Sequence, residues 1–270
     1  MRNPTRRNRN IGTERQGHGQ DNRMKIPASR HDDRLFYEKV DDAVAVERTI
    51  GDCDITFLVQ PVIAGIWHAC TIEDICHLLA HMPVGDITGI DLFLLRQPTR
   101  KQQSLRPVWG RLAYYADTGK YQGRAIALDA QAQGESCRWP RSLTPEDASE
   151  FERLRTDGHP IGEDRRGFTV MPTLESIRAT QLYRTVLHEL GHHVDYRSKI
   201  TDLAKDEAEL DRRRDAYFAR PQSEREAFAH RYAAEHAARL RADGIIPFDR
   251  LNDPTAQKND RLDPAWFAAS

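Results

Sequence analysis

The spacing of apolar residues predicts strands in the first half of the chain. Residues 54–65 form an apolar run rich in β-forming residues, and residues 87–97 form a second one. Residues 105–131 contain two such runs around a polar turn at Asp117–Gly119, which predicts two strands joined by that turn. These segments indicate a small β-sheet.

Helical spacing becomes dominant later in the chain, although one early helix is predicted over residues 71–82, with Thr71 as its cap and Asp74 in the capping-box position. A second is predicted from Thr144, which precedes Pro145, to Gly158. The remainder of 132–172 shows no regular pattern and predicts loops. The apolar residues of 173–196 recur at spacings of three and four, which predicts a longer helix. Two more helices are predicted over residues 202–218 and 223–242.

Together these elements predict an α+β fold that follows a basic tail. Residues 1–30 are rich in Arg, Asn and Gly and predict a disordered segment. Residues 31–270 predict one folded domain. Its sheet lobe would span 31–196 and its helical lobe 197–270.

Composition narrows the partners and the compartment. A net charge of −1 gives no general attraction to nucleic acid or to acidic membranes. No apolar run approaches the roughly 20 residues of a membrane helix. The N-terminal residues lack the apolar core of a signal peptide. We therefore expect no membrane partner, no nucleic acid, and a cytoplasmic protein or one exported without a cleavable signal; the pattern does not indicate an oligomeric state.

The chemistry is concentrated in the sequence TVLHELGHHVDY, residues 185–196. On a helix, His188 and His192 are one turn apart, so both imidazoles project from one face and can bind one Zn²⁺. Glu189 follows the first histidine and can take a proton from water that the metal activates. This H-E-x-x-H pattern resembles the active-site helix of zincin metallopeptidases.

Two further polar residues of this segment, His193 and Asp195, are not predicted to be metal ligands. His193 is rotated by roughly 100° from His192 on the helix, and we expect it to point away from a metal, at the surface or between lobes. Asp195 lies on the same face as the histidine pair. It is either an acceptor that orients a ligand imidazole or an ordinary exposed carboxylate.

Catalytic zinc usually takes three protein ligands, and Glu226 is the candidate for the third. It continues a stripe on the last predicted helix that consists of Ala229, Ala233, Ala237 and Leu240. Glu224 points nearly opposite. The alternative is that Glu226 closes a capping box with Ser223 at the start of the helix.

The sequence EAFA, residues 226–229, resembles the downstream element of zincins with a glutamate ligand, including lethal-factor-like peptidases. A looser similarity extends to bacterial metallopeptidases that cleave phage-type repressors. The resemblance covers residues 188–196 and 226–232. It implies a zincin-like fold with a twisted mixed sheet, an active-site helix above it and a helical lobe. It also implies an edge strand that pairs with extended substrate, for which residues 123–131 and then 166–172 are the candidates.

The chain also departs from the patterns of related families. The position where thermolysin-like enzymes carry an Asp is His230, which leaves the orienting role to His230 or Asp195. Ser198 stands where metzincins have their third histidine. Tyr217 occupies a place that lethal-factor-like enzymes use for the donor to the oxyanion, and Tyr232 is the other option; either is otherwise a packing aromatic.

These features predict a zinc-dependent peptidase that acts on a peptide or protein substrate. His188, His192 and Glu226 would hold Zn²⁺, and Glu189 would be the general base. The alternative is a zinc-containing regulator or scaffold of zincin fold that binds a protein or nucleic acid without turnover, using the Arg-rich tail.

Overall fold

The computed structural model describes residues 34–99, 102, 109–132, 134 and 136–267. The predicted disordered segment 1–30 lies outside these residues. The chain divides into two compact units, Met1–Leu35 and Phe36–Ser270. Every helix and strand described below belongs to the second unit, which contains both the predicted sheet lobe and the predicted helical lobe.

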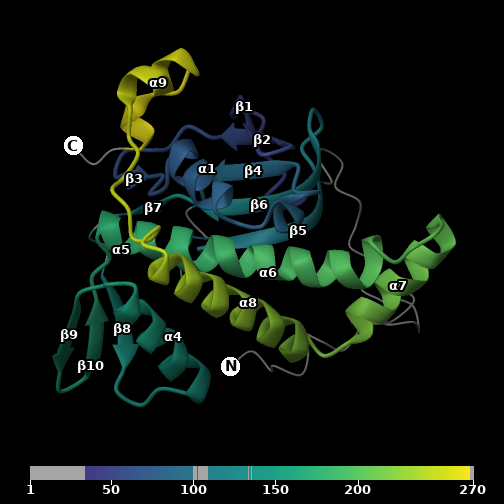
Figure 1. Cartoon of the computed structure of the whole chain (residues 1–270). Helices are drawn as coiled ribbons and strands as arrows, with labels where there is room; N and C mark the ends of the chain where they lie inside the picture. The colour runs from purple at the N-terminus through teal and green to yellow at the C-terminus, as the bar shows by residue number, and fades with distance from the viewer. Residues whose placement is uncertain (1–33, 100–101, 103–108, 133, 135, 268–270) are drawn as a thin grey trace, which may run out of the picture. The chain divides into compact units, whose positions relative to one another are not determined.

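A mixed five-stranded sheet forms the centre of this unit (Figure 1), as expected for an α+β fold. Its strands, in spatial order, are β1 (Val44–Ile50), β2 (Cys53–Val59), β4 (Leu92–Arg96), β6 (Gln122–Asp129) and β5 (Gly110–Asp117). The three inner strands are parallel to one another, and β1 and β5 pair antiparallel at the two edges. The predicted hairpin of residues 105–131 is therefore present as β5 and β6.

Both predicted edge strands are wrong. Residues 123–131 contain β6, which lies between β4 and β5 and is therefore interior. Its last five residues are all buried, which is typical of a strand covered on both faces. Residues 166–172 contain β10 (Gly167–Val170), the middle strand of a separate sheet. The sheet edge on this side is β5, in which only Ala113 and Ala116 are buried and the other residues are partly or fully exposed.

That separate sheet corrects a second expectation, because residues 132–172 were predicted to be loops apart from one helix. Three short strands pair in the order β8 (Cys137–Pro140), β10, β9 (Ile161–Asp164). The helix α4 (Pro145–Thr156) begins after Thr144 as expected. Its Phe151 and Leu154 pack with Trp139 and Val170, so α4 and the strands share a small core. A two-stranded ribbon joins β3 (Ile66–Trp67) to β7 (Gln131–Ala132).

The main core lies between one face of the five-stranded sheet and a layer of helices. Helix α1 (Ile72–Ala80) begins with the predicted capping box of Thr71 and Asp74. It is followed by the short helix α2 (Val84–Ile87). Buried side chains from α1, the sheet and the long helices form one cluster, and a second cluster covers the opposite sheet face.

The predicted helix 173–196 is continuous but not uniform. It consists of α5 (Leu174–Ala179), π-helical turns over Thr180–Val186, and α6 (Leu187–Tyr196), and more π-helical turns follow at Arg197–Thr201. Helix α7 (Glu207–Ala219) then leads into α8 (Gln222–Ala242). Figure 1 shows α6 and α8 side by side along the sheet. The C-terminal segment adds α9 (Pro254–Asn259) and a 3₁₀ turn at Pro264–Trp266.

Candidate metal centre

Helices α6 and α8 approach each other closely because Gly191 has no side chain. A Cβ atom at Gly191 would lie 2.9 Å from the Cα and 3.1 Å from the carbonyl oxygen of Ala229, and 3.1 Å from the Cβ of Tyr232. Ala229 is fully buried at this crossing. Small residues on both helices therefore set the distance between α6 and the side chains that α8 projects toward it.

This close packing brings together three side chains that the sequence selected. The Nε2 atoms of His188 and His192 are 3.1 Å apart. Oε2 of Glu226 lies 3.3 Å from Nε2 of His188 and 3.5 Å from Nε2 of His192. A tetrahedral zinc ion with bonds of 2.0–2.1 Å places its ligand atoms about 3.3–3.4 Å apart. The three atoms are therefore spaced as the protein ligands of one such ion.

Glu226 does not cap the helix that carries it. Helix α8 begins after Pro221, and its N-terminus has no hydrogen bond from a capping side chain. Instead Glu226 faces the two histidines, and its other oxygen accepts a 3.4 Å hydrogen bond from Gln222. The capping-box alternative is thus wrong. The stripe behind Glu226 is buried, as expected, at Ala229, Ala233, Ala237 and Leu240.

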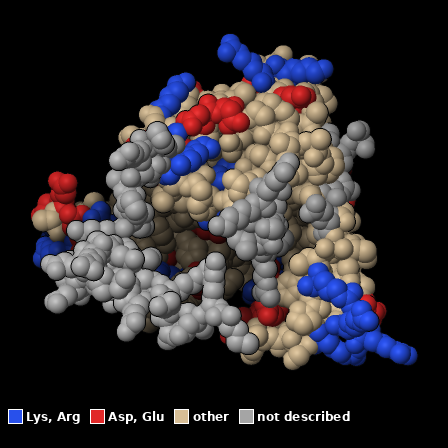
Figure 2. All heavy atoms as spheres, turned by 180° about the vertical axis from the view of Figure 1, so that it is seen from behind, with Lys and Arg blue, Asp and Glu red and all other residues tan. Residues whose placement is uncertain are grey.

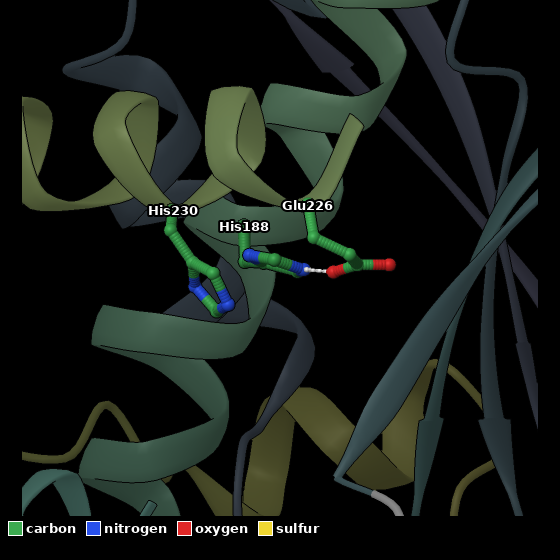
Figure 3. A group of neighbouring side chains, drawn as sticks. All are labelled: His188, Glu226 and His230. Carbon is green, nitrogen blue, oxygen red and sulfur yellow. Dashed lines mark ion pairs between the residues drawn. The ribbon is translucent and has the colours of Figure 1, made fainter. Parts of the chain in front are cut away.

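His230 is a further neighbour of this group. Figure 3 shows Glu226 and His230 projecting from α8 on either side of the His188 ring. Ligand atoms of His188, Glu226 and His230 all lie within 4.8 Å of one another. That limit is wider than the spacing of about 3.3–3.4 Å between two ligand atoms on a tetrahedral zinc. The distances from Nε2 of His192 to Nε2 of His188 and to Oε2 of Glu226, 3.1 and 3.5 Å, are close to that spacing. His230 packs its ring against His188, with centroids 4.5 Å apart.

The electrostatics of the group favour an anionic glutamate between the two imidazoles. Hydrogen bonds from His188 and then His192 hold the pKa of the Glu226 carboxyl well below its usual range. The Nδ1 atoms of both rings are buried and have no hydrogen-bond partner among the described residues. No acceptor in this part of the chain therefore orients either ring from behind.

Glu189 lies beside this group and is held by the edge of the sheet. Its side chain is buried, with 7% exposed, and its Oε2 accepts a 2.7 Å hydrogen bond from the backbone N–H of Leu112 in β5. Burial raises the pKa of the Glu189 carboxyl. This contact was not predictable from side-chain patterns, because the donor is a backbone group 77 residues away.

His193 and Asp195 take structural positions away from the pair of histidines. His193 is fully buried, with its ring bonded to Arg124 at 2.9 Å and to the carbonyl of Thr88 at 3.0 Å. It points away from His192 as expected, although it is not at the surface. Asp195 is also fully buried and pairs with Lys199 and Tyr217, so it is neither an exposed carboxylate nor a partner of either histidine ring.

The two candidate tyrosines have their hydroxyl groups engaged. Tyr217 donates to Oδ2 of Asp195 at 2.9 Å, and Tyr232 donates to Oδ2 of Asp86 at 2.7 Å. Tyr217 lies in an aromatic cluster with Tyr114 of β5. The structure therefore brings neither hydroxyl into the group of His188, His192 and Glu226, and the role of Tyr217 as an oxyanion donor stays a prediction.

A cavity of about 490 Å³ opens next to His188 and Glu189. Its walls come from α8, from the π-helical segment before α6, from the start of β5 and from α4. The sequence predicted α4 as a helix but contained no signal that it would face the site. The contact depends on Arg184, which binds Asp157 at 2.7 Å and both oxygens of Glu150 at 3.0 Å.

A group of exposed arginines lies on the β8–β10–β9 sheet. Figure 2 shows Lys and Arg side chains gathered over the β8–β10–β9 sheet, where Arg138, Arg141, Arg165 and Arg166 are exposed. Arg138 and Arg141 pair with Asp164 and Glu163, which reduces the net charge of this patch. No described helix is long and apolar enough to cross a bilayer.

Comparison with known proteins leaves the chain without an assigned relative. It matches no known family, no curated protein and no solved structure.

Proposed function

We propose that the chain is a zinc-dependent peptidase of zincin-like fold. The observation that carries the proposal is the spacing of 3.1–3.5 Å among the Nε2 atoms of His188 and His192 and the Oε2 atom of Glu226. Two neutral imidazoles and one carboxylate are a known ligand set for catalytic zinc. His188, His192 and Glu226 would hold the ion.

Zinc bound in this way supplies Lewis acidity, which polarises a peptide carbonyl and makes water more acidic. Glu189 would take the proton from the attacking water and pass it to the leaving amine. Its burial and its bond to Leu112 support this role, because both restrict the carboxylate to one position next to His188. A raised pKa also brings a carboxylate closer to the range in which it accepts and returns protons at neutral pH.

Strand β5 is the candidate for binding the substrate backbone. Among the described strands it pairs only with β6, so its other edge has no strand partner there. The N–H of Leu112 points toward Glu189 at that edge. An extended peptide can add to such an edge by backbone hydrogen bonds. We therefore assign to β5 the substrate-pairing role for which the resemblance to zincins made residues 123–131, and then 166–172, the candidates.

The proposal is tested by measuring zinc content and hydrolysis in matched variants. We expect the purified protein to contain one zinc ion and Glu226→Gln to lose it. Glu224→Gln, on the same helix and exposed, should retain both zinc and activity. Glu189→Gln should keep zinc and lose hydrolysis of a mixture of denatured proteins by about 10²–10⁴-fold.

Three results would contradict parts of this proposal. Full activity in Glu189→Gln would exclude Glu189 as the base. Absence of zinc from the wild type, together with unchanged stability on replacing His188 or His192, would exclude the metal centre. Zinc without hydrolysis of any substrate in the wild type would favour the regulator or scaffold instead.

A further inference from the structure

The cavity beside His188 runs along α8, away from Glu226. Its α8 wall consists of residues that recur every three or four positions, from His230 through Ala233, Ala234 and Ala237 to Arg241. With a rise of about 1.5 Å per residue, this stretch spans roughly 16 Å. The volume of about 490 Å³ is within the range of ligand sites in proteins. The cavity is therefore larger than a packing defect and is open at the proposed reaction centre.

Part of the cavity wall is apolar. Three alanines of α8 leave space that longer side chains would fill, and Trp109 and Tyr183 contribute aromatic surface. Ala233 and Ala237 are buried against the core, whereas Ala234 is exposed toward the cavity. Ala234 is thus the wall residue whose enlargement reduces the cavity without disturbing the core.

The charged side chains of the opposite wall neutralise one another. Arg184 binds Asp157 and Glu150, and Nε of Arg153 binds Oε2 of Glu150 at 2.9 Å. The two arginines and two carboxylates of this group have no net charge, so an ionised side chain in the cavity would lose hydration without gaining an excess counter-ion from them. Nη2 of Arg184 has no hydrogen-bond partner among the described residues and can donate to a neutral oxygen of the substrate. Arg241, the remaining cation of the lining, is exposed at the far end of α8.

We propose that this cavity binds a bulky uncharged side chain, aromatic or large aliphatic, next to the scissile bond of the substrate, and that Ala234 limits the size of that side chain. The inference depends on the proposed peptidase function. Burial of a large apolar group against Trp109 and the alanines supplies the binding energy. An apolar pocket discriminates by about 10–200-fold between side chains that differ by one methylene group.

The first test compares cleavage sites in a mixed peptide library by mass spectrometry, using Ala234→Trp and the matched control Ala238→Trp. Ala238 is also exposed on α8, one turn further on, and does not line the cavity. We expect the wild type and Ala238→Trp to prefer Phe, Tyr, Trp, Leu or Met beside the cleaved bond. Ala234→Trp should lose at least tenfold of this preference and favour Ala, Gly or Ser.

A second test does not need catalysis and separates this inference from the peptidase proposal. Saturation-transfer NMR would compare binding of N-acetylphenylalaninamide and N-acetylglycinamide to the same proteins and to Glu189→Gln. We expect only the aromatic amide to bind, and only Ala234→Trp to abolish its binding. Ala234→Leu, a smaller substitution, should weaken binding of the aromatic amide to an intermediate degree. It keeps the test decisive if Ala234→Trp does not fold.

The outcomes distinguish the two proposals. Three results would overturn the cavity inference and leave the peptidase proposal intact. They are cleavage without any preference for the residues beside the bond, a preference for acidic residues there, and an equal change of preference in Ala234→Trp and Ala238→Trp. Selective binding of the aromatic amide without any cleavage would overturn the peptidase and leave the apolar site. Neither binding nor cleavage would overturn both.

Discussion

Replacing Gly191 with alanine tests whether the crossing of α6 and α8 positions the metal centre. The added Cβ would meet Cα and the carbonyl oxygen of Ala229 at 2.9 and 3.1 Å, where ordinary contacts begin at 3.4 Å. Both atoms belong to the backbone of α8, which cannot move aside as a flexible side chain can. The helices must therefore separate by at least about 0.5 Å, the difference between 3.4 and 2.9 Å.

Two effects of opposite sign decide the stability change. Alanine is favoured over glycine inside a helix by about 1 kcal/mol. Overpacking of a closely packed contact costs about 1–3 kcal/mol. We therefore expect Gly191→Ala to lower the free energy of unfolding by about 0–2 kcal/mol. A shift of about 0.5 Å also exceeds the ~0.2 Å tolerance of zinc–ligand distances, so zinc affinity should fall by about tenfold or more.

The assays are urea unfolding and competitive zinc titration, with Gly85→Ala as the matched control. Gly85 lies in helix α2, and a Cβ there would meet nothing within 4 Å. The control should gain stability, by up to about 1 kcal/mol, and keep its zinc affinity. If Gly191→Ala also gained stability and bound zinc as tightly as the wild type, the crossing would not position the ligands, and the reasoning would be refuted.

Three further predictions follow from buried groups and from the metal centre. Burial lowers the pKa of His68 and His159 to about 4 and that of His193 to about 3. These three histidines, the most buried among those whose pKa burial lowers, therefore stay neutral in the folded protein but gain protons in the unfolded chain below about pH 6.5. The free energy of unfolding should thus fall by ~1.4 kcal/mol per histidine between pH 7.5 and 5.5. If the three buried histidines cause this pH dependence, it should persist in a double variant that carries His188→Asn and His192→Asn. Asp74→Ala should lower the free energy of unfolding in urea by ~3–5 kcal/mol, because it removes the carboxylate that binds the buried Arg178 guanidinium at 2.9 and 3.0 Å. Asp164→Ala removes the partner of Arg138 in an exposed ion pair and should change the free energy of unfolding little. Equal effects of the two substitutions would contradict the role of burial. Chelation should lower the melting temperature of the wild type, because zinc at 1,000 times its Kd stabilises the folded state by ~4 kcal/mol. The melting temperature of His188→Ala should not change on chelation. Equal shifts in both proteins would place the metal at another site.

The sequence by itself determined the features that depend on local spacing. A separation of four residues on a helix places His188 and His192 on one face, whatever the rest of the chain does. The caps at Thr71 and Thr144 act within a single turn, and both helices begin where these residues indicated. The stripe that continues from Glu226 was visible because helical periodicity relates residues three and four positions apart.

Only the tertiary structure decided which distant groups meet. The order of strands makes β5 the edge and β6 an interior strand, and hydrophobic patterns cannot rank two strands of one hairpin by their position in the sheet. Leu112 reaches Glu189 through its backbone N–H, a group that every residue except proline carries and that no sequence pattern marks. Asp195, on the face of the histidines, pairs instead with Tyr217 and Lys199, because the segments that follow α6 return those side chains to it. Contacts of this kind depend on how the elements pack, and local spacing carries no information about that packing.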